Sequence, residues 1–225
     1  MSGAGGQEEI IVIPSMLTYI STHQMQLLRQ IGEHFLISLL ALLVAAVIGI
    51  LCGYAASLSP KSERIVSAPF QVLRVVPSLA ILILLIPVMG TGIKPAVTAL
   101  TILAIPPVLL NTIVGFREVP DFMVESARGI GMSEKDVLFK VRIPLALPMI
   151  LAGLRTGLVE VFASTTLAAK IGAGGLGEII FTGLGLNRAD LLILGGLLVA
   201  VLSLGSGAVF DRISRRMMKY KYSGG

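Results

Sequence analysis

Long apolar runs separated by short polar connections dominate the chain. A helix of about 20 residues crosses the roughly 30 Å hydrocarbon core of a bilayer. Five runs reach that length: 35–58, 66–88, 94–115, 145–168 and 190–210. Residues 15–33 instead mix apolar residues with Gln, Arg and Glu, which predicts an amphipathic helix lying at the membrane interface. The pattern therefore predicts an all-α integral membrane protein with about five transmembrane helices and an N-terminal interfacial helix.

Composition supports the bilayer as solvent. The chain is 55% hydrophobic and 14% charged, with a mean hydropathy of +0.90, whereas about a quarter of the residues in a soluble domain are charged. Its net charge of +5 would suit nucleic acid, but Trp is absent and no stripe of basic and aromatic residues occurs. We therefore expect a membrane protein that binds no nucleic acid.

Basic residues gather in alternate connections. The connections after the first, third and fifth runs carry Lys61, Arg64, Arg117, Arg128, Lys135, Lys140, Arg142, Arg212, Arg215, Arg216, Lys219 and Lys221. The opposite connections clearly carry only Arg29, Lys94 and Arg188. Because cytoplasmic loops are rich in Lys and Arg, this bias predicts an external N-terminus and a cytoplasmic C-terminus. It divides the chain into an external segment 1–33, a transmembrane domain 34–216 and a basic cytoplasmic tail 217–225.

The connection 117–144 is a large polar excursion on the predicted cytoplasmic side. Its capping and breaking residues predict a short helix, a tight turn and a second short helix that ends where the fourth run begins. These signals are Pro120 with Asp121, Gly129 with Gly131, Ser133 with Asp136, and Pro144. The residues alone leave open whether this shape docks into another protein or is a solvated loop.

The excursion resembles the EAA loop of ABC importer permeases. The segment Glu125-Ser-Ala-Arg-Gly-Ile-Gly131 is followed, nine residues later, by Val141-Arg-Ile-Pro144, with the spacing of that motif and only modest changes in side-chain size. In that family the loop is a coupling helix that rests on the ATPase. The resemblance implies a type I importer permease core of the methionine-permease kind in the bacterial inner membrane. It assigns ATPase coupling to Glu125, Ala127, Gly129, Gly131 and Pro144.

Other segments narrow the resemblance to the permeases of osmoprotectant importers. Val76-Pro-Ser-Leu-Ala and Lys94-Pro-Ala carry it best, whereas the Gly-rich run 167–177 is shared with methionine-type permeases. The implied cargo is a quaternary amine such as glycine betaine, carnitine or choline. Two alternatives stay open: the same kind of importer for another small solute such as an amino acid, and a membrane scaffold that transports nothing.

The chain lacks the parts that would make it a complete transporter. It has no G-x-x-x-x-G-K-[ST] phosphate loop, so ATP and Mg are expected in a separate ATPase subunit, and we expect no catalytic residues and no metal site here. Only about 15 residues follow the fifth run, too few for a substrate-binding domain. Five helices also enclose no generous pathway. We therefore expect three partners: an ATPase, an external binding protein, and a second permease that is either identical or paralogous.

Prolines interrupt the second and third runs, and broken helices free carbonyls that can line a pathway, although simple kinks explain them equally well. The candidate pathway residues are Pro77, Ser78, Pro106, Asn111 and Thr112. For Asn111 and Thr112 the favoured alternative is hydrogen bonding across helices. In the Gly-rich run, close helix packing against a partner is the interpretation for Gly172, Gly174, Gly175 and Gly177.

A few polar residues inside or beside the runs need separate interpretation. Arg74 is expected to extend toward the cytoplasm. Arg155 and Glu160 are five residues apart and so do not share a helical face, which favours contacts with other helices or with the partner permease. For Arg155 a structural pair is the favoured interpretation. His23 and His34 have no neighbours typical of a metal site and are interpreted as interfacial.

Overall fold

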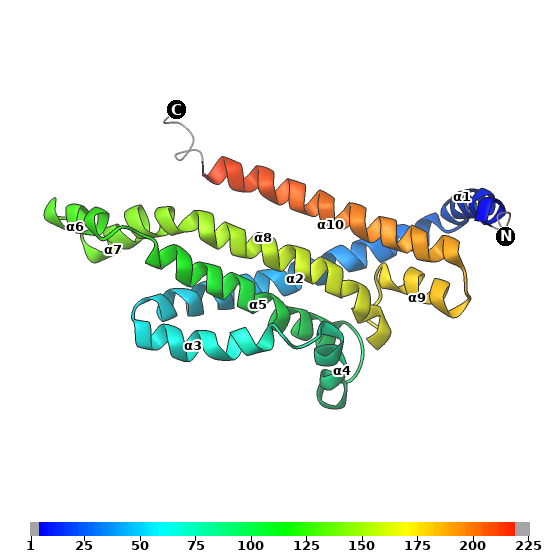
Figure 1. Ribbon diagram of the computed structural model, residues 1–225, viewed down its shortest axis with the longest axis horizontal. Coiled ribbons are helices and arrows are strands. Elements are labelled where there is room, and N and C mark those ends of the chain that lie inside the picture. Colours follow the sequence, from blue (N-terminus) through cyan, green and yellow to red (C-terminus); the bar gives the residue numbers. More distant parts are fainter. Residues whose placement is uncertain (1–4, 219–225) are drawn as a thin grey trace. The chain divides into compact units, whose positions relative to one another are not determined.

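The computed structural model describes residues 5–218, and in this part of the chain the regular structure is entirely helical. Figure 1 shows the order of the elements. They are α1 (Gly5–Thr22), α2 (Gln24–Ser57), α3 (Pro60–Leu73), α4 (Ser78–Met89), α5 (Ile93–Arg117), α6 (Asp121–Gly129), α7 (Glu134–Val137), the π-helix η1 (Leu138–Arg142), α8 (Ile143–Ala168), the 3-10 helix η2 (Ala169–Ile171), α9 (Gly177–Gly185) and α10 (Ala189–Met217).

The described chain forms two compact units. One unit contains residues up to 40, 78–100 and 162–205. The other contains 41–77, 101–161 and the residues from 206 onward. Four of the elements, α2, α5, α8 and α10, pass from one unit into the other along the sequence.

Helices of spanning length occur where the hydrophobic pattern predicts them, with one exception. Four helices in the described range are long and apolar enough to cross a membrane: α2, α5, α10 and the continuous helix Glu134–Ile171 that contains α8. The predicted run 66–88 is not one helix but a bent pair, α3 and α4, which makes a fifth span if the pair is counted as one. The break lies at residues 74–77, because Pro77 has no N–H and disfavours helical geometry at Val76.

The N-terminal helix boundary also differs from the prediction. Residues 15–33 are divided at His23 between the end of α1 and the first turns of α2. Leu27 and Gln30 in those turns are buried, and Leu27 packs in a core with Leu176, Ile179 and Leu191. This packing favours extending α2 toward its N-terminus, so the segment is no separate helix.

His34 is buried within the described chain, and its predicted position at the membrane interface stays a prediction. Its side chain is fully inaccessible, and its Nε2 lies 3.0 Å from the Phe162 carbonyl oxygen. One turn further, the Ser38 hydroxyl lies 2.8 Å from the Thr165 hydroxyl. These bonds satisfy polar groups that would otherwise be costly to bury, and they join α2 to the end of α8.

Glycines let α2 and α8 approach α5 closely. A Cβ atom on Gly53 would lie 2.7 Å from the Thr112 Cβ, and one on Gly153 would lie 2.8 Å from the Pro107 carbonyl oxygen. Gly49 and Gly157 lie four residues away on the same two helices and also face α5. Both pairs follow the G-x-x-x-G pattern of close helix contacts in membranes, a signal that our sequence interpretation missed.

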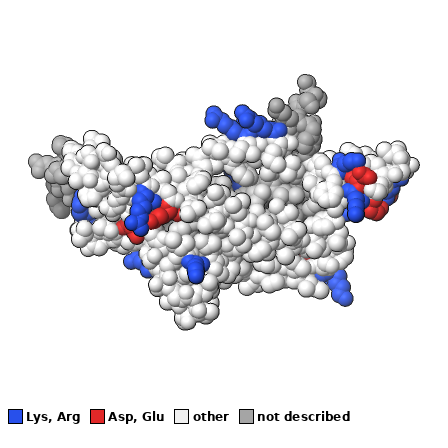
Figure 2. All heavy atoms as spheres, turned by 180° about the vertical axis from the view of Figure 1, so that it is seen from behind, with Lys and Arg blue, Asp and Glu red and all other residues white. Residues whose placement is uncertain are grey.

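The surface of the described chain is largely uncharged, as Figure 2 shows for one face. Exposed apolar side chains on α2 include Leu43 and Val47, and those on α10 include Val201 and Leu204. Large exposed apolar side chains in this number would be unfavourable in water. It fits a protein whose helices face lipid.

Candidate functional site

The polar excursion begins with α6, which follows an extended residue, Pro120, and carries Asp121 in its first turn. An acidic side chain at this end interacts favourably with the helix dipole. Ala127 is buried, and Val124 packs against a core cluster that includes Phe116 of α5 and Ala146 of α8. One face of α6 is therefore attached to the ends of two spanning helices, and its other face is exposed.

The turn after α6 depends on one glycine. Gly131 has a φ of 86°, in the left-handed region that glycine adopts without strain. Its N–H bonds to the Arg128 carbonyl at 2.9 Å, and the Met132 N–H bonds to the Ala127 carbonyl at 3.1 Å. Gly129, predicted to share this role, is the last residue of α6 and has no left-handed backbone. The geometry thus requires glycine at 131 and not at 129.

The second short helix is capped as predicted. The Ser133 hydroxyl accepts a hydrogen bond from the Asp136 N–H at 3.2 Å and lies 2.6 Å from the Asp136 carboxylate. Arg128 donates to both carboxylate oxygens of Glu134, at 2.8 and 3.0 Å, and these hydrogen bonds raise the pKa of Arg128 above its ordinary value. A bidentate pair fixes orientation as well as distance. It therefore ties α6 to α7.

Pro144 does not end the second helix, contrary to the prediction. The helix runs on from Glu134 through η1 into α8, and the Ile143 N–H bonds to the Leu138 carbonyl five residues earlier. Proline cannot donate an N–H, and its ring clashes with the carbonyl of the residue four positions before it. The wider π turn lies just before Pro144 and accommodates the proline without a break.

Large apolar side chains stand out from this helix–turn–helix. Phe122 is 66% exposed, Ile130 81% and Phe139 66%. Figure 2 shows Lys and Arg intermixed with Asp and Glu over the same elements. Exposed aromatic and aliphatic groups rimmed by charges are typical of protein docking surfaces. We call this surface, formed by α6, α7 and η1, the docking element.

The candidate pathway residues occupy different settings. Pro77 is exposed at the break before α4, and Ser78 is the half-buried first residue of α4. Pro106, Asn111 and Thr112 lie along α5, where Pro106 and Thr112 are buried.

Asn111 and Thr112 do not bond across helices, so that favoured alternative is wrong. The Asn111 side-chain amide donates to the Pro107 carbonyl at 2.8 Å, and the Thr112 hydroxyl donates to the Val108 carbonyl at 2.7 Å. Both acceptors belong to the same helix, four residues earlier. In a lipid environment these short-range bonds satisfy the polar groups locally.

Arg155, a charged residue of the membrane domain, pairs with another helix, as expected. Arg155 of α8 bonds to Asp211 of α10, with the Arg155 Nε 2.7 Å from a carboxylate oxygen. Arg74 is exposed at the C-terminal end of α3, and its extension toward the cytoplasm stays a prediction. The Arg155 pair confirms the structural interpretation of that arginine.

The Gly-rich run between η2 and α9 packs against its own chain. Gly172, Gly174 and Gly175 have positive φ angles of 76°, 83° and 84°. The Gly175 N–H donates to the Glu33 carboxylate at 3.1 Å, and a Cβ on Gly174 would lie 2.5 Å from that carboxylate. A Cβ on Gly177 would collide with the Thr166 carbonyl oxygen. The contacts in the structure are thus with α2 and α8, while packing of this run against a partner stays a prediction.

The family model for the binding-protein-dependent transport system inner membrane component matches residues 45–219, most of the chain. The chain belongs to this family. The permease is 41% identical to the carnitine transport permease protein OpuCB of Listeria monocytogenes, over 84% of this chain and 87% of the relative. It is 38% identical to the glycine betaine/carnitine/choline transport system permease protein OpuCB of Bacillus subtilis, with the same two coverages.

Solved structures agree with the fold. The permease matches a chain of the MetNI methionine ABC transporter in an inward-facing conformation, with a TM-score of 0.75 and 25% identity. The match covers 87% of this chain and 98% of that one. The all-α type I importer permease fold predicted from the sequence is therefore confirmed. The permease is a multi-pass membrane transport subunit and not an enzyme, and it works with a separate ATPase and with substrate-binding partners.

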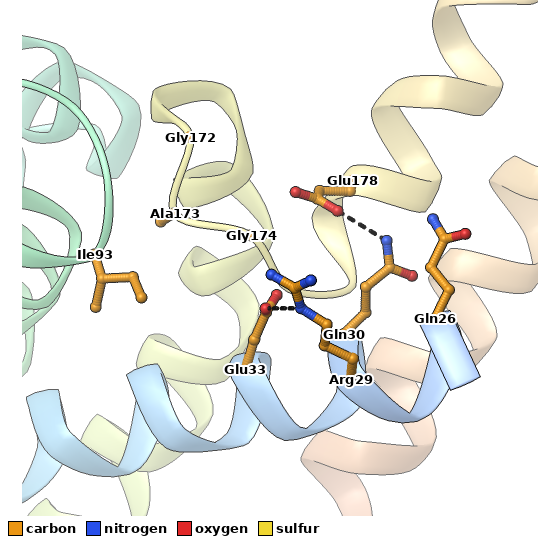
Figure 3. A pocket seen from close by; sticks show the side chains of 9 residues that line it. All are labelled: Gln26, Arg29, Gln30, Glu33, Ile93, Gly172, Ala173, Gly174 and Glu178. Carbon is orange, nitrogen blue, oxygen red and sulfur yellow. Dashed lines mark hydrogen bonds and ion pairs between the residues drawn. The ribbon is translucent and has the colours of Figure 1, made fainter. Parts of the chain in front are cut away.

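The permease also contains a polar hollow that the sequence interpretation missed. Figure 3 shows this hollow, of about 440 Å³, between the N-terminal turns of α2, the Gly-rich run and α9. Arg29 bonds to Glu33 at 2.7 Å, and the Gln30 side-chain nitrogen donates to Glu178 at 2.9 Å. A signal was present, because Gln26, Gln30 and Glu33 repeat at three- and four-residue spacing on one helical face. In the described range, no group of His, Cys, Asp and Glu is suited to hold a metal ion.

Proposed function

We propose that the permease moves quaternary-amine osmoprotectants such as glycine betaine, carnitine and choline into a bacterial cell, driven by a separate ATP-binding-cassette ATPase. The cargo is supported by the names of the two OpuCB relatives, which cover most of this chain. The coupling to an ATPase through the docking element is supported by the EAA-like spacing from Glu125 to Pro144. In this proposal the N-terminus lies outside the inner membrane and the C-terminus lies in the cytoplasm, following the basic connections.

The docking element is the observation that carries the coupling role. Phe122, Ile130 and Phe139 are exposed on a segment that is too polar to enter lipid. A bound protein partner would bury these three apolar side chains. The ATPase is proposed to bind there and to hold ATP and Mg. Glu125, Ala127 and Gly131 belong to α6 and the turn after it, and Pro144 belongs to the helix that carries motion onward.

The continuous helix from Glu134 through α8 suits the transfer of force. A movement of the docking element reaches α8 without crossing a flexible loop, because α7, η1 and α8 follow one another without a break. Arg128 and Glu134 hold α6 to that helix, so α6 and α7 move together. ATP binding in the partner then shifts the balance between outward and inward access.

Two more partners complete the proposed assembly. An external binding protein delivers the solute. A second permease, identical or paralogous, completes the pathway, and the Gly-rich run 172–177 is part of the contact between the two permeases. Pro77, Ser78, Pro106, Asn111 and Thr112 remain the proposed pathway positions. The buried settings of Pro106 and Thr112 mean that α5 must move before they meet solute.

Uptake by the reconstituted complex tests this proposal. We expect ATP-dependent accumulation of labelled glycine betaine, with competition by unlabelled choline and carnitine and none by methionine or histidine. Competition by an amino acid alone would identify another kind of importer on the same fold. A permease that never copurifies with an ATPase, and whose vesicles accumulate no solute, would be a scaffold instead.

A further inference from the structure

A second hollow in the same unit, of about 450 Å³, shares Gln26, Gln30 and Glu178 with the hollow of Figure 3. It is lined in addition by Tyr19, Lys170 and Phe181, from α1, η2 and α9. It therefore combines a carboxylate, side-chain amides and aromatic rings. The described function uses none of these groups.

The Gln30 side chain, which lines both hollows, has a hydrogen-bond acceptor without a partner in the described part of the chain. Its side chain is 3% exposed, and its nitrogen donates to Glu178, while its Oε1 has no hydrogen-bond partner among the described residues. Figure 3 shows this oxygen turned away from Glu178 and toward Gln26, which lines both hollows. A buried amide oxygen without a partner is unfavourable, and a positive charge beside it would compensate.

A positive charge already occupies part of this hollow. The Lys170 ammonium lies 4.3 Å from the centre of the Phe181 ring, within the range of a cation–π interaction. Tyr19 is engaged elsewhere, stacked on His23 at 4.2 Å with Arg188 over its ring at 5.9 Å. Phe181 is thus the ring that a ligand cation can use, and Lys170 stands where that cation would bind.

We propose that this hollow binds the alkylammonium group of a small soluble organic cation, which displaces the Lys170 ammonium from Phe181 and pairs with the Glu178 carboxylate, while the buried Gln30 oxygen contributes its partial negative charge from behind the lining. That the cation is the transported quaternary amine rests on the proposed function. Methyl groups on a quaternary nitrogen share its positive charge and pack against both an aromatic face and oxygen atoms. The tethered lysine keeps the hollow filled when solute is absent and competes with it.

Binding to the permease without its binding protein tests this site. The full-length permease, copurified with its ATPase, is placed in phosphatidylglycerol nanodiscs and titrated with labelled choline, with tetramethylammonium as a second probe. We expect saturable binding that Glu178→Gln weakens about tenfold or more and Phe181→Leu weakens about 2- to 30-fold. Lys170→Met, which removes the competitor, should tighten binding. Lys94→Met makes the same charge change outside the hollow and should leave binding unchanged.

The direction in which Lys170→Met changes choline binding distinguishes a competing lysine from a merely structural one. A merely structural lysine would give unchanged or weaker binding in Lys170→Met and overturn the proposal. Unchanged binding in Glu178→Gln would overturn it too. So would displacement of choline by sodium at equal concentration, which indicates an inorganic cation, or by phosphatidylethanolamine in the discs, which indicates a lipid head group.

Failure of the site and failure of the proposed function give different results. If the wild-type complex imports glycine betaine but the permease binds no choline in nanodiscs, the site inference alone is wrong. If choline binds with the expected variant effects but the complex imports no quaternary amine, the site stands and the transport proposal is wrong. Glu178 is exposed and Phe181 half-buried, and the thermal midpoint of each variant checks that it remains folded.

Discussion

Replacing Gly153 by alanine measures how much the permease depends on the close contact of α8 with α5. The new Cβ would lie 2.8 Å from both the Pro107 carbonyl oxygen and the Asn111 Cβ, and neither atom is the end of a flexible side chain. Overpacking of this kind typically costs about 1–3 kcal/mol. Alanine also favours a helix over glycine by up to about 1 kcal/mol, so Gly153→Ala alone mixes two opposite effects.

Gly207→Ala is the matched control, because Gly207 lies inside α10 with no atom within 4 Å of its added Cβ. Both variants gain the same helix preference, so their difference in unfolding free energy isolates the collision at about 1–3 kcal/mol. In a protein of this size 1 kcal/mol shifts the thermal midpoint by about 2–4 °C. We expect Gly153→Ala to unfold roughly 2–12 °C below Gly207→Ala.

The single cysteine makes this measurement direct. Cys52 is half-buried, so a thiol-reactive fluorophore added to detergent-solubilised permease labels it as the helices separate. Equal midpoints for the two variants, or a higher one for Gly153→Ala, would refute the inference that the glycines of α8 hold the helix against α5.

Three further changes test local features. Gly131→Ala places a side chain at a left-handed backbone, at a cost of about 1–2 kcal/mol, and should lower ATP-driven uptake severalfold. The control Gly129→Ala should leave uptake unchanged. Equal uptake by the two variants would contradict the role of the turn. Ser133→Ala removes a cap worth about 0.5–2 kcal/mol and should speed hydrogen exchange in α7, a result that unchanged rates would exclude. Glu33→Gln weakens the bond to Gly175 and should speed exchange of that amide, and full protection in the variant would show that the carboxylate is dispensable.

Local signals predicted most of the helices and the outline of the docking element. Hydrophobic runs are a property of neighbouring residues, and so is a cap such as Ser133 with Asp136, which is why both were found. The coupling role of Glu125 was predicted from the resemblance to the EAA loop. The residues alone did not decide between a docking segment and a solvated loop. Pro144 misled the prediction because the π turn that accommodates it depends on how the whole helix packs.

Contacts between distant residues could not be predicted in the same way. Gln30 and Glu178 are 148 positions apart, so no local pattern joins them, although the polar spacing along α2 was visible. The burial of His34 was not predicted, because its partner, the Phe162 carbonyl, belongs to another helix. The G-x-x-x-G motifs of α2 and α8 are visible in the sequence. That both motifs pack against α5 follows only from the fold.

The π-helix η1 fixes the rotational phase between the docking element and α8. Each residue of an α-helix advances the chain by about 100° around its axis, so one residue more or fewer in this segment turns everything before it by that angle. Deleting one residue from Leu138–Arg142 would remove the wider turn that accommodates Pro144 and would rotate the exposed Phe122 and Ile130 to a different side of the helix axis. The partner would then meet a different face of the docking element.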